Sequence, residues 1–305
     1  MKFSVVVVTY NRLELLKECL FNIRNQTYPA YKTIIVDNAS TDGTAAFLDT
    51  MDKKSFYVIH EKENLGGAGG FKAGIQAAAE TDCDYILIID DDAMLDSHFL
   101  EICNGYIENH PNCLACSGTV ITDGTIQLNH RRVISNHKLF IERSIPTEEY
   151  SKETFEYELS TFCGMLISRE IVGKIGLPAD EYFIFYDDTE YSMRINKITT
   201  FTNINRAKLN HKTAVTAEKY GFYDRMSWKT YYGHRNRLDA AKRHLGKLTS
   251  LMVNLEFSAF IIGAFPILLN HNTHKRGKYI IKMLKDARKD GNSGKLGKNI
   301  NYQRT

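Results

Sequence analysis

The sequence predicts an α/β protein with a mostly parallel sheet, flanked by helices and followed by a helical C-terminal appendage. Over the first 95 residues, β-branched apolar runs alternate with helical patterns, an order typical of parallel sheets with right-handed connections. Each apolar run ends in polar residues, so the strand ends could line one edge of the sheet. The last third of the chain shows helical spacing and a strong excess of basic residues.

Length and composition fit one large α/β domain with an appendage, because the chain has 305 residues and 43% of them are hydrophobic. Residues 271–305 hold ten Lys and Arg against two Asp, a local charge of +8, which leaves −5 for the rest. An acidic body without a nucleic-acid-binding motif argues against a nucleic-acid partner. Six scattered Cys and the lack of a signal-peptide pattern predict a cytoplasmic chain with reduced thiols.

The first two strands are predicted within residues 2–12 and at residues 32–36, each followed by a helix. Leucine and isoleucine recur at helical spacing over residues 13–23 after the first strand. Asp37 stands just past the end of the second strand, and Ser40 or Thr41 is placed to cap the helix that follows.

A third short strand, residues 56–60, leads into a glycine-rich loop over residues 64–75 and then a helix that ends near Glu80. Glycines let the backbone approach a ligand closely, and free N–H groups at a helix start favour anions, so a diphosphate is a reasonable occupant. The motif matches neither the Walker pattern nor a dinucleotide fingerprint, and a plain tight turn is the alternative.

The central strand is predicted at residues 85–89, where an aliphatic run that does not alternate indicates burial on both faces. It runs directly into Asp90, Asp91 and Asp92. Three carboxylates in one turn are most easily explained by a divalent cation among them, with Asp90 and Asp92 facing one site. The alternative is a solvated acidic turn in which Asp92 caps the next helix.

Later elements are predicted as a helix to residue 109, strands at 114–121 and 160–169, and a helix that ends at 173–176. An aromatic segment then delivers Asp187 and Asp188 to a helix start. A carboxylate walled by aromatic rings can have a raised pKa and act as a proton acceptor, while helix capping is the simpler role.

His211 lies in a short polar break, where a lone histidine is more often structural than a ligand. A helix is predicted at residues 228–238. Residues 248–269 form the most apolar window but contain Asn254, Glu256 and Pro266. We therefore expect an interfacial or core helix rather than one that spans a membrane.

Four segments occur in this order: VVVTYNR (6–12), VDNASTDGT (36–44), NLGGAGGF (64–71) and the Asp-x-Asp of 90–92. Together they resemble glycosyltransferase family 2, the inverting enzymes with the Rossmann-like GT-A fold. Two later segments, YDDTEY (186–191) and NHK (210–212), are most similar to the branch with bacterial galactofuranosyl- and rhamnosyltransferases. The resemblance implies a catalytic domain at 1–240, followed by a helical segment at 241–305.

The resemblance also implies a nucleotide-sugar donor at the sheet edge. The residues it assigns to the donor are Thr9, Arg12 and Asp37 around base and ribose, Asn64, Gly66 and Gly70 near the diphosphate, and Asp90 and Asp91. Asp90, Asp92 and His211 would hold Mn²⁺ or Mg²⁺. Asp188 matches the catalytic base, and Asp187 its acidic neighbour. Lys72 departs from the branch, which has Asn there.

We expect UDP-galactofuranose as the donor, with dTDP-rhamnose as the alternative, and a hydroxyl of a cell-surface or lipid-linked glycan as the acceptor. A nucleotidyltransferase would place a basic glycine-rich loop after the first strand, where this chain has Thr9 to Arg12. A degenerate nucleotide-sugar-binding module is the non-enzymatic alternative.

The C-terminal segment predicts that the protein works at the inner face of the cell membrane. Leu248, Leu251, Met252, Leu255 and Ala259 share one helical face ahead of the basic tail. Such a helix beside Lys and Arg can rest on an anionic leaflet, so we expect peripheral membrane contact through residues 248–305. The alternative is a core helix or homo-oligomer interface with a solvated tail.

Overall fold

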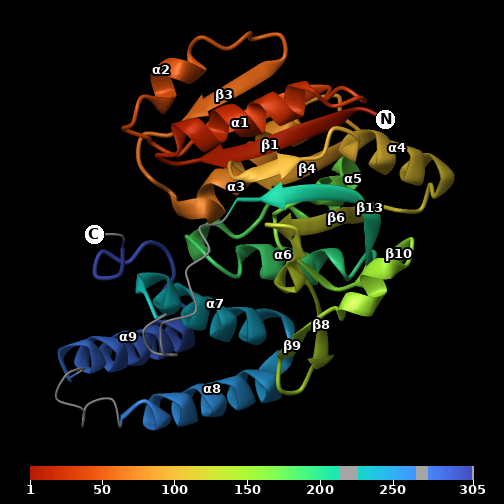
Figure 1. The fold of residues 1–305 in the computed structure, drawn as a ribbon. Coiled ribbons are helices and arrows are strands. Elements are labelled where there is room, and N and C mark those ends of the chain that lie inside the picture. Colours follow the sequence, from red (N-terminus) through yellow and green to blue (C-terminus); the bar gives the residue numbers. More distant parts are fainter. Residues whose placement is uncertain (213–225, 266–273, 304–305) are drawn as a thin grey trace. The chain divides into compact units, whose positions relative to one another are not determined.

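The computed structural model describes residues 1–212, 226–265 and 274–303, which fall into two units (Figure 1). Unit 1 consists of Met1–Val133, Arg143–Asp180 and Asp188–Ala214. Unit 2 consists of Ile134–Glu142, Glu181–Asp187 and Val215–Thr305. The predicted division at residue 240 stays a prediction.

Unit 1 is built on a large sheet whose first half follows the predicted strands. These are β1 (Phe3–Thr9), β2 (Lys32–Asp37), β3 (Phe56–His60) and β4 (Tyr85–Asp90). β1 pairs in parallel with both β2 and β4, and β2 pairs in parallel with β3. Because parallel strands end at the same edge, the polar ends of β1, β2 and β4 are brought together.

The second half of the sheet is mixed. Its strands are β6 (Ala115–Thr122), β10 (Thr154–Tyr157), β12 (Met165–Ser168) and β13 (Phe201–His211), with the short β5 (Ala93–Leu95) and β7 (Thr125–Ile126). The path runs β10-β13-β6-β12-β4-β1-β2-β3, with β5 on β13 and β7 on β6. β12 lies antiparallel between β4 and β6, whereas β13 is parallel to β6.

Two sequence predictions need correction in this half. The strand expected at 160–169 is split into β11 (Leu159–Ser160) and β12, because Gly164 turns the chain at a φ of +82°. His211 is the last residue of β13 rather than part of a polar break. Outside the large sheet, β11 pairs with β8 (Arg131–Asn136), and β8 is followed in the order by β9 (Ile141–Ser144).

Helices cover both faces of the sheet, as Figure 1 shows. One core contains residues of α1 (Leu13–Arg24), α2 (Thr44–Leu48) and α4 (Phe99–Asn109). The other contains residues of α3 (Gly66–Ala79), α5 (Arg169–Ile175) and α6 (Asp187–Ile195). Val5 and Val7 of β1 face the first core and Val6 faces the second, as the period of two requires.

Three short 3₁₀ helices lie between the strands and helices: η1 (Leu128–His130), η2 (Thr147–Ser151) and η3 (Asp180–Tyr182).

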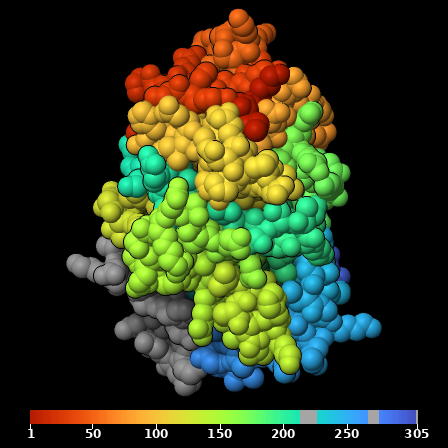
Figure 2. All heavy atoms as spheres, turned by 90° about the vertical axis from the view of Figure 1, so that its right-hand side faces the viewer, coloured from red at the N-terminus to blue at the C-terminus, as the bar shows by residue number. Residues whose placement is uncertain are grey.

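In Figure 2 the face turned to the viewer includes α4, in yellow, and the segment of η2 and β10, in light green.

The start of α2 differs from the prediction that Ser40 or Thr41 caps it. The helix begins at Thr44, whose N–H donates to Asp42 Oδ1 at 3.2 Å. Ser40 Oγ instead accepts the Asn11 N–H at 2.9 Å, which ties the loop after β1 to the loop after β2.

The predicted glycine-rich loop is largely helix, because α3 already begins at Gly66. A Cβ on Gly70 would lie 2.6 Å from Val8 Cγ1, and one on Gly74 would lie 2.4 Å from Val6 Cγ1. Both distances are far below a van der Waals contact. Glycine therefore lets α3 approach β1 more closely than any other residue would.

Gly74→Ala is expected to lower the free energy of unfolding by about 1–3 kcal/mol, because the added methyl overpacks the contact with Val6. The matched control is Gly105→Ala in α4, where a Cβ meets no atom within 4 Å. That change should instead stabilise by about 0.5–1 kcal/mol through helix propensity. Urea denaturation measures both, and Val6→Ala should restore part of the loss. Equal stability of Gly74→Ala and the parent would contradict the packing argument.

Unit 2 contains three long helices in its described part: α7 (Trp228–His244), α8 (Gly246–Gly263) and α9 (His274–Ser293). α7 extends the predicted helix by more than a turn and begins with a capping box between Ser227 and Thr230. The guanidinium of Arg235, which is buried, donates to the carbonyls of Tyr182 and Gly297 at 3.0 and 2.6 Å.

α8 buries only one of its faces, through Thr249, Val253, Phe257 and Ile261. The apolar side chains predicted to share a face, from Leu248 to Ala259, are exposed, and so are Ile262 and Phe265. Residues 266–269 of the predicted apolar window lie outside the described residues. Within the described part of the chain, no helix is both apolar enough and long enough to cross a bilayer.

Candidate active site

The acidic turn after β4 is the centre of the candidate site, and it is held by the end of β1. Thr9 Oγ1, at that end, donates to Asp91 Oδ2 at 2.7 Å. Arg12, which precedes α1, places Nη1 3.1 Å from Asp91 Oδ1 and 2.6 Å from Asp92 Oδ2. Asp91 and Asp92 are buried, and the chain continues from Asp92 into β5. The alternative of a solvated turn that caps a helix is therefore wrong.

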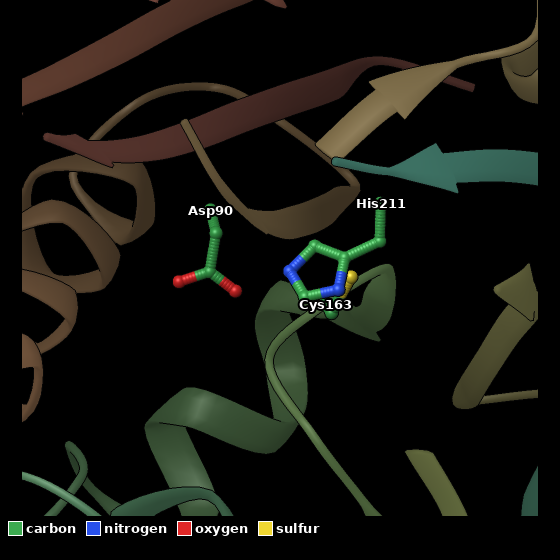
Figure 3. A group of neighbouring side chains, drawn as sticks. All are labelled: Asp90, Cys163 and His211. Atoms are coloured by element: carbon green, nitrogen blue, oxygen red, sulfur yellow. The ribbon is translucent and has the colours of Figure 1, made fainter. Parts of the chain in front are cut away.

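Three side chains from separate elements gather beside this turn: Asp90, Cys163 and His211 (Figure 3). Their ligand atoms all lie within 4.8 Å of one another. His211 lies there because β13 pairs with β5, which places His211 opposite Ala93. Cys163 is held there because the N–H of the next residue, Gly164, donates to the Ile88 carbonyl at 3.0 Å.

Asp92 offers an atom that is short of partners. Its Oδ1 is buried and forms an ion pair with His211, whose Nε2 lies 3.1 Å away, without meeting the geometry of a hydrogen bond. A buried carboxylate oxygen without a hydrogen bond is costly unless something else coordinates it. Carboxylates with one imidazole are a ligand set for a hard divalent cation. Asp90, Asp92 and His211 could therefore hold such an ion.

The pKa shifts of Asp90, Asp91 and Asp92 indicate that the negative charge of the acidic turn is not fully balanced. Burial, with repulsion from Asp92, raises the pKa of Asp90 to about 7. Burial also raises the pKa of Asp91 to about 6, against the attraction of Arg12. Although burial opposes it, His211 and Arg12 hold the pKa of Asp92 below its ordinary value. A divalent cation would relieve this repulsion.

The pKa of His211 depends on the same carboxylates. Burial acts to lower its pKa, but Asp92 and Asp90 together raise the pKa of His211 above the ordinary value. Its ring lies edge-on to the ring of His130, 5.3 Å between centroids. Burial, aided by Arg131, lowers the pKa of His130 to about 2, so His130 stays neutral. Burial raises the pKa of the Cys163 thiol well above its usual value.

The residues predicted around a base and ribose lie at the ends of β1 and β2. Asp37 is buried, and its Oδ1 accepts the Ser40 N–H at 2.9 Å while its Oδ2 lies 3.2 Å from His60 Nδ1. Thr9 accepts the Asn38 N–H through its carbonyl at 3.0 Å, so the two strand ends are joined.

Asn38, which sequence reasoning did not single out, links this edge to the start of α3. Its Nδ2 donates to the Gly66 carbonyl at 2.9 Å, and its Oδ1 accepts the Leu65 N–H at 2.9 Å. Asn64 Oδ1 accepts the Gly66 N–H at 2.8 Å. Lys72, where the branch has Asn, pairs with Asp180 at 2.9 Å. Gly70 is required by its close packing against Val8, whether or not a ligand is bound.

Asp187 and Asp188 open α6, as predicted. Asp187 is buried. Asp188 Oδ1 accepts the Thr189 N–H, so it also serves the helix start. Thr189 Oγ1 in turn accepts from Arg132 Nη2 at 3.0 Å.

Sequence reasoning missed Cys163, His130 and Arg131. Arg131 is fully buried and donates to the carbonyls of Cys163 and Gly118 at 3.1 and 2.7 Å. It thereby fixes the segment that carries Cys163. No local pattern marks any of the three, because their positions follow from pairings between strands far apart in sequence.

Comparison with known proteins adds three findings. The sequence profile of the family described as glycosyl transferase family 2 matches residues 4–176. Poly(ribitol-phosphate) beta-glucosyltransferase of Bacillus spizizenii is 36% identical over 33% of this chain and 16% of its own. Galactofuranosyltransferase GlfT1 of Mycolicibacterium smegmatis is 27% identical over 62% of this chain and 64% of its own. The chain thus spans less than two thirds of the length of these curated relatives.

Solved structures show the same fold. The crystal structure of S. aureus TarS 1–349 in complex with UDP covers 96% of this chain and 92% of its own at 14% identity, with a TM-score of 0.59. GalNAc-T7, solved with UDP, GalNAc and Mn²⁺, covers 79% of this chain and 48% of its own at 12% identity, with a TM-score of 0.61. The fold is GT-A, and with the family profile matching more than half of its residues, the chain belongs to glycosyltransferase family 2.

Proposed function

We propose that this family 2 glycosyltransferase is a metal-dependent inverting enzyme that transfers galactofuranose from UDP-galactofuranose to a hydroxyl of a glycan acceptor. The observation that carries the proposal is the buried Asp92 Oδ1, which accepts no hydrogen bond from the described residues and lies beside His211 at the strand ends. A ligand set built there suits an enzyme that must hold a diphosphate.

The relatives support the donor. Galactofuranosyltransferases align over 61% and 62% of this chain, beyond its N-terminal half. Poly(ribitol-phosphate) glycosyltransferases align over only 33% and 36%. Two of the similar structures were solved with UDP. A uridine diphosphate sugar is therefore the donor class we infer, with Thr9, Arg12, Asp37 and Asp91 around the nucleoside end.

Asp90, Asp92 and His211 would hold the cation, and Asn64 with Gly66 and Gly70 would lie near the diphosphate. When bound, Mn²⁺ or Mg²⁺ would neutralise the charge that develops on the departing diphosphate. One imidazole among oxygen ligands favours Mn²⁺. The N–H groups at the start of α3 add a partial positive charge for the same leaving group.

Asp188 is the base in this proposal, and the buried Asp187 supports it. Asp188 takes the proton from the acceptor hydroxyl as the hydroxyl oxygen forms its bond to the anomeric carbon. The bond from that carbon to the diphosphate oxygen breaks on the opposite side. Attack from the face opposite the nucleotide inverts the configuration of the anomeric carbon.

A panel of nucleotide sugars tests the donor. We expect nucleotide release to be fastest with UDP-galactofuranose, and slower with dTDP-rhamnose, UDP-glucose and UDP-N-acetylglucosamine. UDP-galactopyranose is the matched control, because it differs only in the ring form of the sugar. A preference for dTDP-rhamnose would mean that dTDP-rhamnose, rather than UDP-galactofuranose, is the donor. Equal rates with UDP-galactofuranose and UDP-galactopyranose would contradict recognition of the furanose ring. Release with none of these donors would favour a binding module.

The acceptor we propose is a cell-surface or lipid-linked glycan, reached from the cytoplasmic side of the cell membrane. In this arrangement residues 1–240 carry out transfer, and residues 248–305 make the peripheral membrane contact. The exposed apolar face of α8 and the basic α9 support that contact. Self-association through the same face stays the alternative.

A further inference from the structure

α8 and α9 enclose a groove of about 450 Å³ within unit 2, and Figure 1 shows the two helices side by side. Eight residues line it: Ser258, Ile261, Ile262, Phe265, Lys285, Arg288, Lys289 and Asn292. A hollow of this size can take a phosphate headgroup and the first part of an alkyl chain.

The two walls of the groove have opposite chemistry. α8 contributes Ile261 and Ile262, Phe265 follows just after the end of α8, and α9 contributes Lys285, Arg288 and Lys289. Among the residues that the structure describes, no carboxylate lines the groove. A ligand that satisfies both walls must carry negative charge on one side and apolar surface on the other.

The acids of α9 make their hydrogen bonds with groups other than the cations of the groove. Asp286 accepts from Lys282 and from Tyr302 Oη, each at 2.6 Å, and Asp290 accepts from Tyr231 Oη at 2.6 Å. Neither Lys285 nor Lys289 pairs with a carboxylate among the residues that the structure describes. Although burial opposes it, Lys282, Tyr302 and Lys289 lower the pKa of Asp286, so Asp286 offsets part of the Lys289 charge and the rest is left for a bound anion.

Two contacts position the cations over the groove. Arg288 Nε donates to Asn254 Oδ1 of α8 at 2.8 Å. Lys285 Nζ stands 5.3 Å from the centre of the Phe265 ring, within range of a cation–π interaction. The basic wall is thus anchored to the apolar wall, and a bound anion would meet groups already in place.

The apolar wall continues onto an exposed surface. Ile262 is 69% exposed, and Leu255, Leu251 and Leu248 follow on the same side of α8 with exposed fractions of 54%, 55% and 63%. A stripe of this kind is a place where an alkyl chain or the acyl boundary of a bilayer can lie.

We propose that the α8–α9 groove binds the phosphate headgroup of an anionic membrane lipid, with the lipid chains along the exposed stripe of α8. The inference rests on the membrane contact of the proposed function and gives it a defined site, but it does not depend on the donor or on Asp188. Free phosphate would leave the apolar wall unused, whereas a lipid phosphate uses both walls.

Liposome co-sedimentation of the full chain tests the site. The groove variant is Lys285→Glu with Lys289→Glu, and the matched control is Lys275→Glu with Lys278→Glu, which makes the same charge change elsewhere on α9. On phosphatidylcholine vesicles containing phosphatidylglycerol, we expect the groove variant to bind at least about tenfold more weakly than the parent. The control variant should lose much less. Equal losses would mean diffuse attraction and would overturn the site.

A second measurement distinguishes lipid from phosphate. Titration calorimetry should show binding of dihexanoylphosphatidylglycerol, and little binding of inorganic phosphate, by the parent chain. Ile262→Ser should weaken the lipid binding and leave the solubility of the chain intact, because this side chain is already exposed. Equal affinity for both probes would overturn the role of the apolar wall. Nucleotide release with a soluble acceptor reports the transfer reaction separately, so either proposal can fail alone.

Discussion

Replacing the proposed base, Asp188→Asn, is expected to lower turnover by about 10²-fold or more while the affinity for UDP stays near that of the parent. Asparagine keeps the size of the side chain and the Oδ1 atom that accepts the Thr189 N–H, so the start of α6 is preserved. It removes only the ability to take a proton. Stopped assays of UDP release give the turnover, and titration calorimetry gives the affinity.

The control for this change is Asp123→Asn. Asp123 lies in an exposed turn at a φ of +47°, a conformation that asparagine tolerates well. The same chemical substitution there should leave turnover unchanged. Turnover of the Asp188 variant close to that of the parent would remove Asp188 from its proposed role.

The second large effect is expected at the proposed cation site. Asp92→Ala removes both the Oδ1 that lacks a hydrogen bond and the Oδ2 that accepts from Arg12. Loss of an outer-shell partner typically costs 10–100-fold in metal affinity, so loss of a ligand should cost at least about 100-fold. We also expect excess EDTA to abolish transfer by the parent and Mn²⁺ to restore it better than Mg²⁺.

Asp91→Asn is the matched control for the cation site, because Asp91 contacts Thr9 and Arg12 instead of His211. Its Mn²⁺ affinity, measured from the paramagnetic resonance of free Mn²⁺, should change much less than that of the Asp92 variant. Full transfer in EDTA, or equal metal affinity of the Asp92 variant and the parent, would refute metal dependence.

The strands of the first half of the sheet were predictable because their sequence signal is local. In β1, β2 and β4, runs of valine and isoleucine fill strands that are buried on both faces, and each run stops at a polar residue. Where burial comes from distant partners, the prediction was less accurate. Residues 160–169 looked like one strand, but the turn at Gly164 depends on the pairing of its N–H with β4.

The glycines of α3 show a second limit. Glycine usually marks a loop, since it weakens a helix. Here Gly70 and Gly74 lie inside the helix because β1 stands too close for a side chain, a distance that no local pattern reveals. Likewise, the sequence indicated Asp90, Asp92 and His211, and the structure pairs His211 with Asp92 and places it beside Asp90. The sequence gave no sign of Cys163, whose place beside Asp90 and His211 depends on tertiary pairing.

The position of β13 in the sheet has a consequence for biosynthesis. β13 pairs with β6, β5 and β10, and its last residue is His211. While the ribosome is still translating residues before 211, the growing sheet has an open edge at β6, and the acidic turn lacks its imidazole. Such long-range pairing is slow, and an open strand edge invites aggregation. The nascent chain thus covers the β6 edge and completes the candidate metal-ligand set in the same late step.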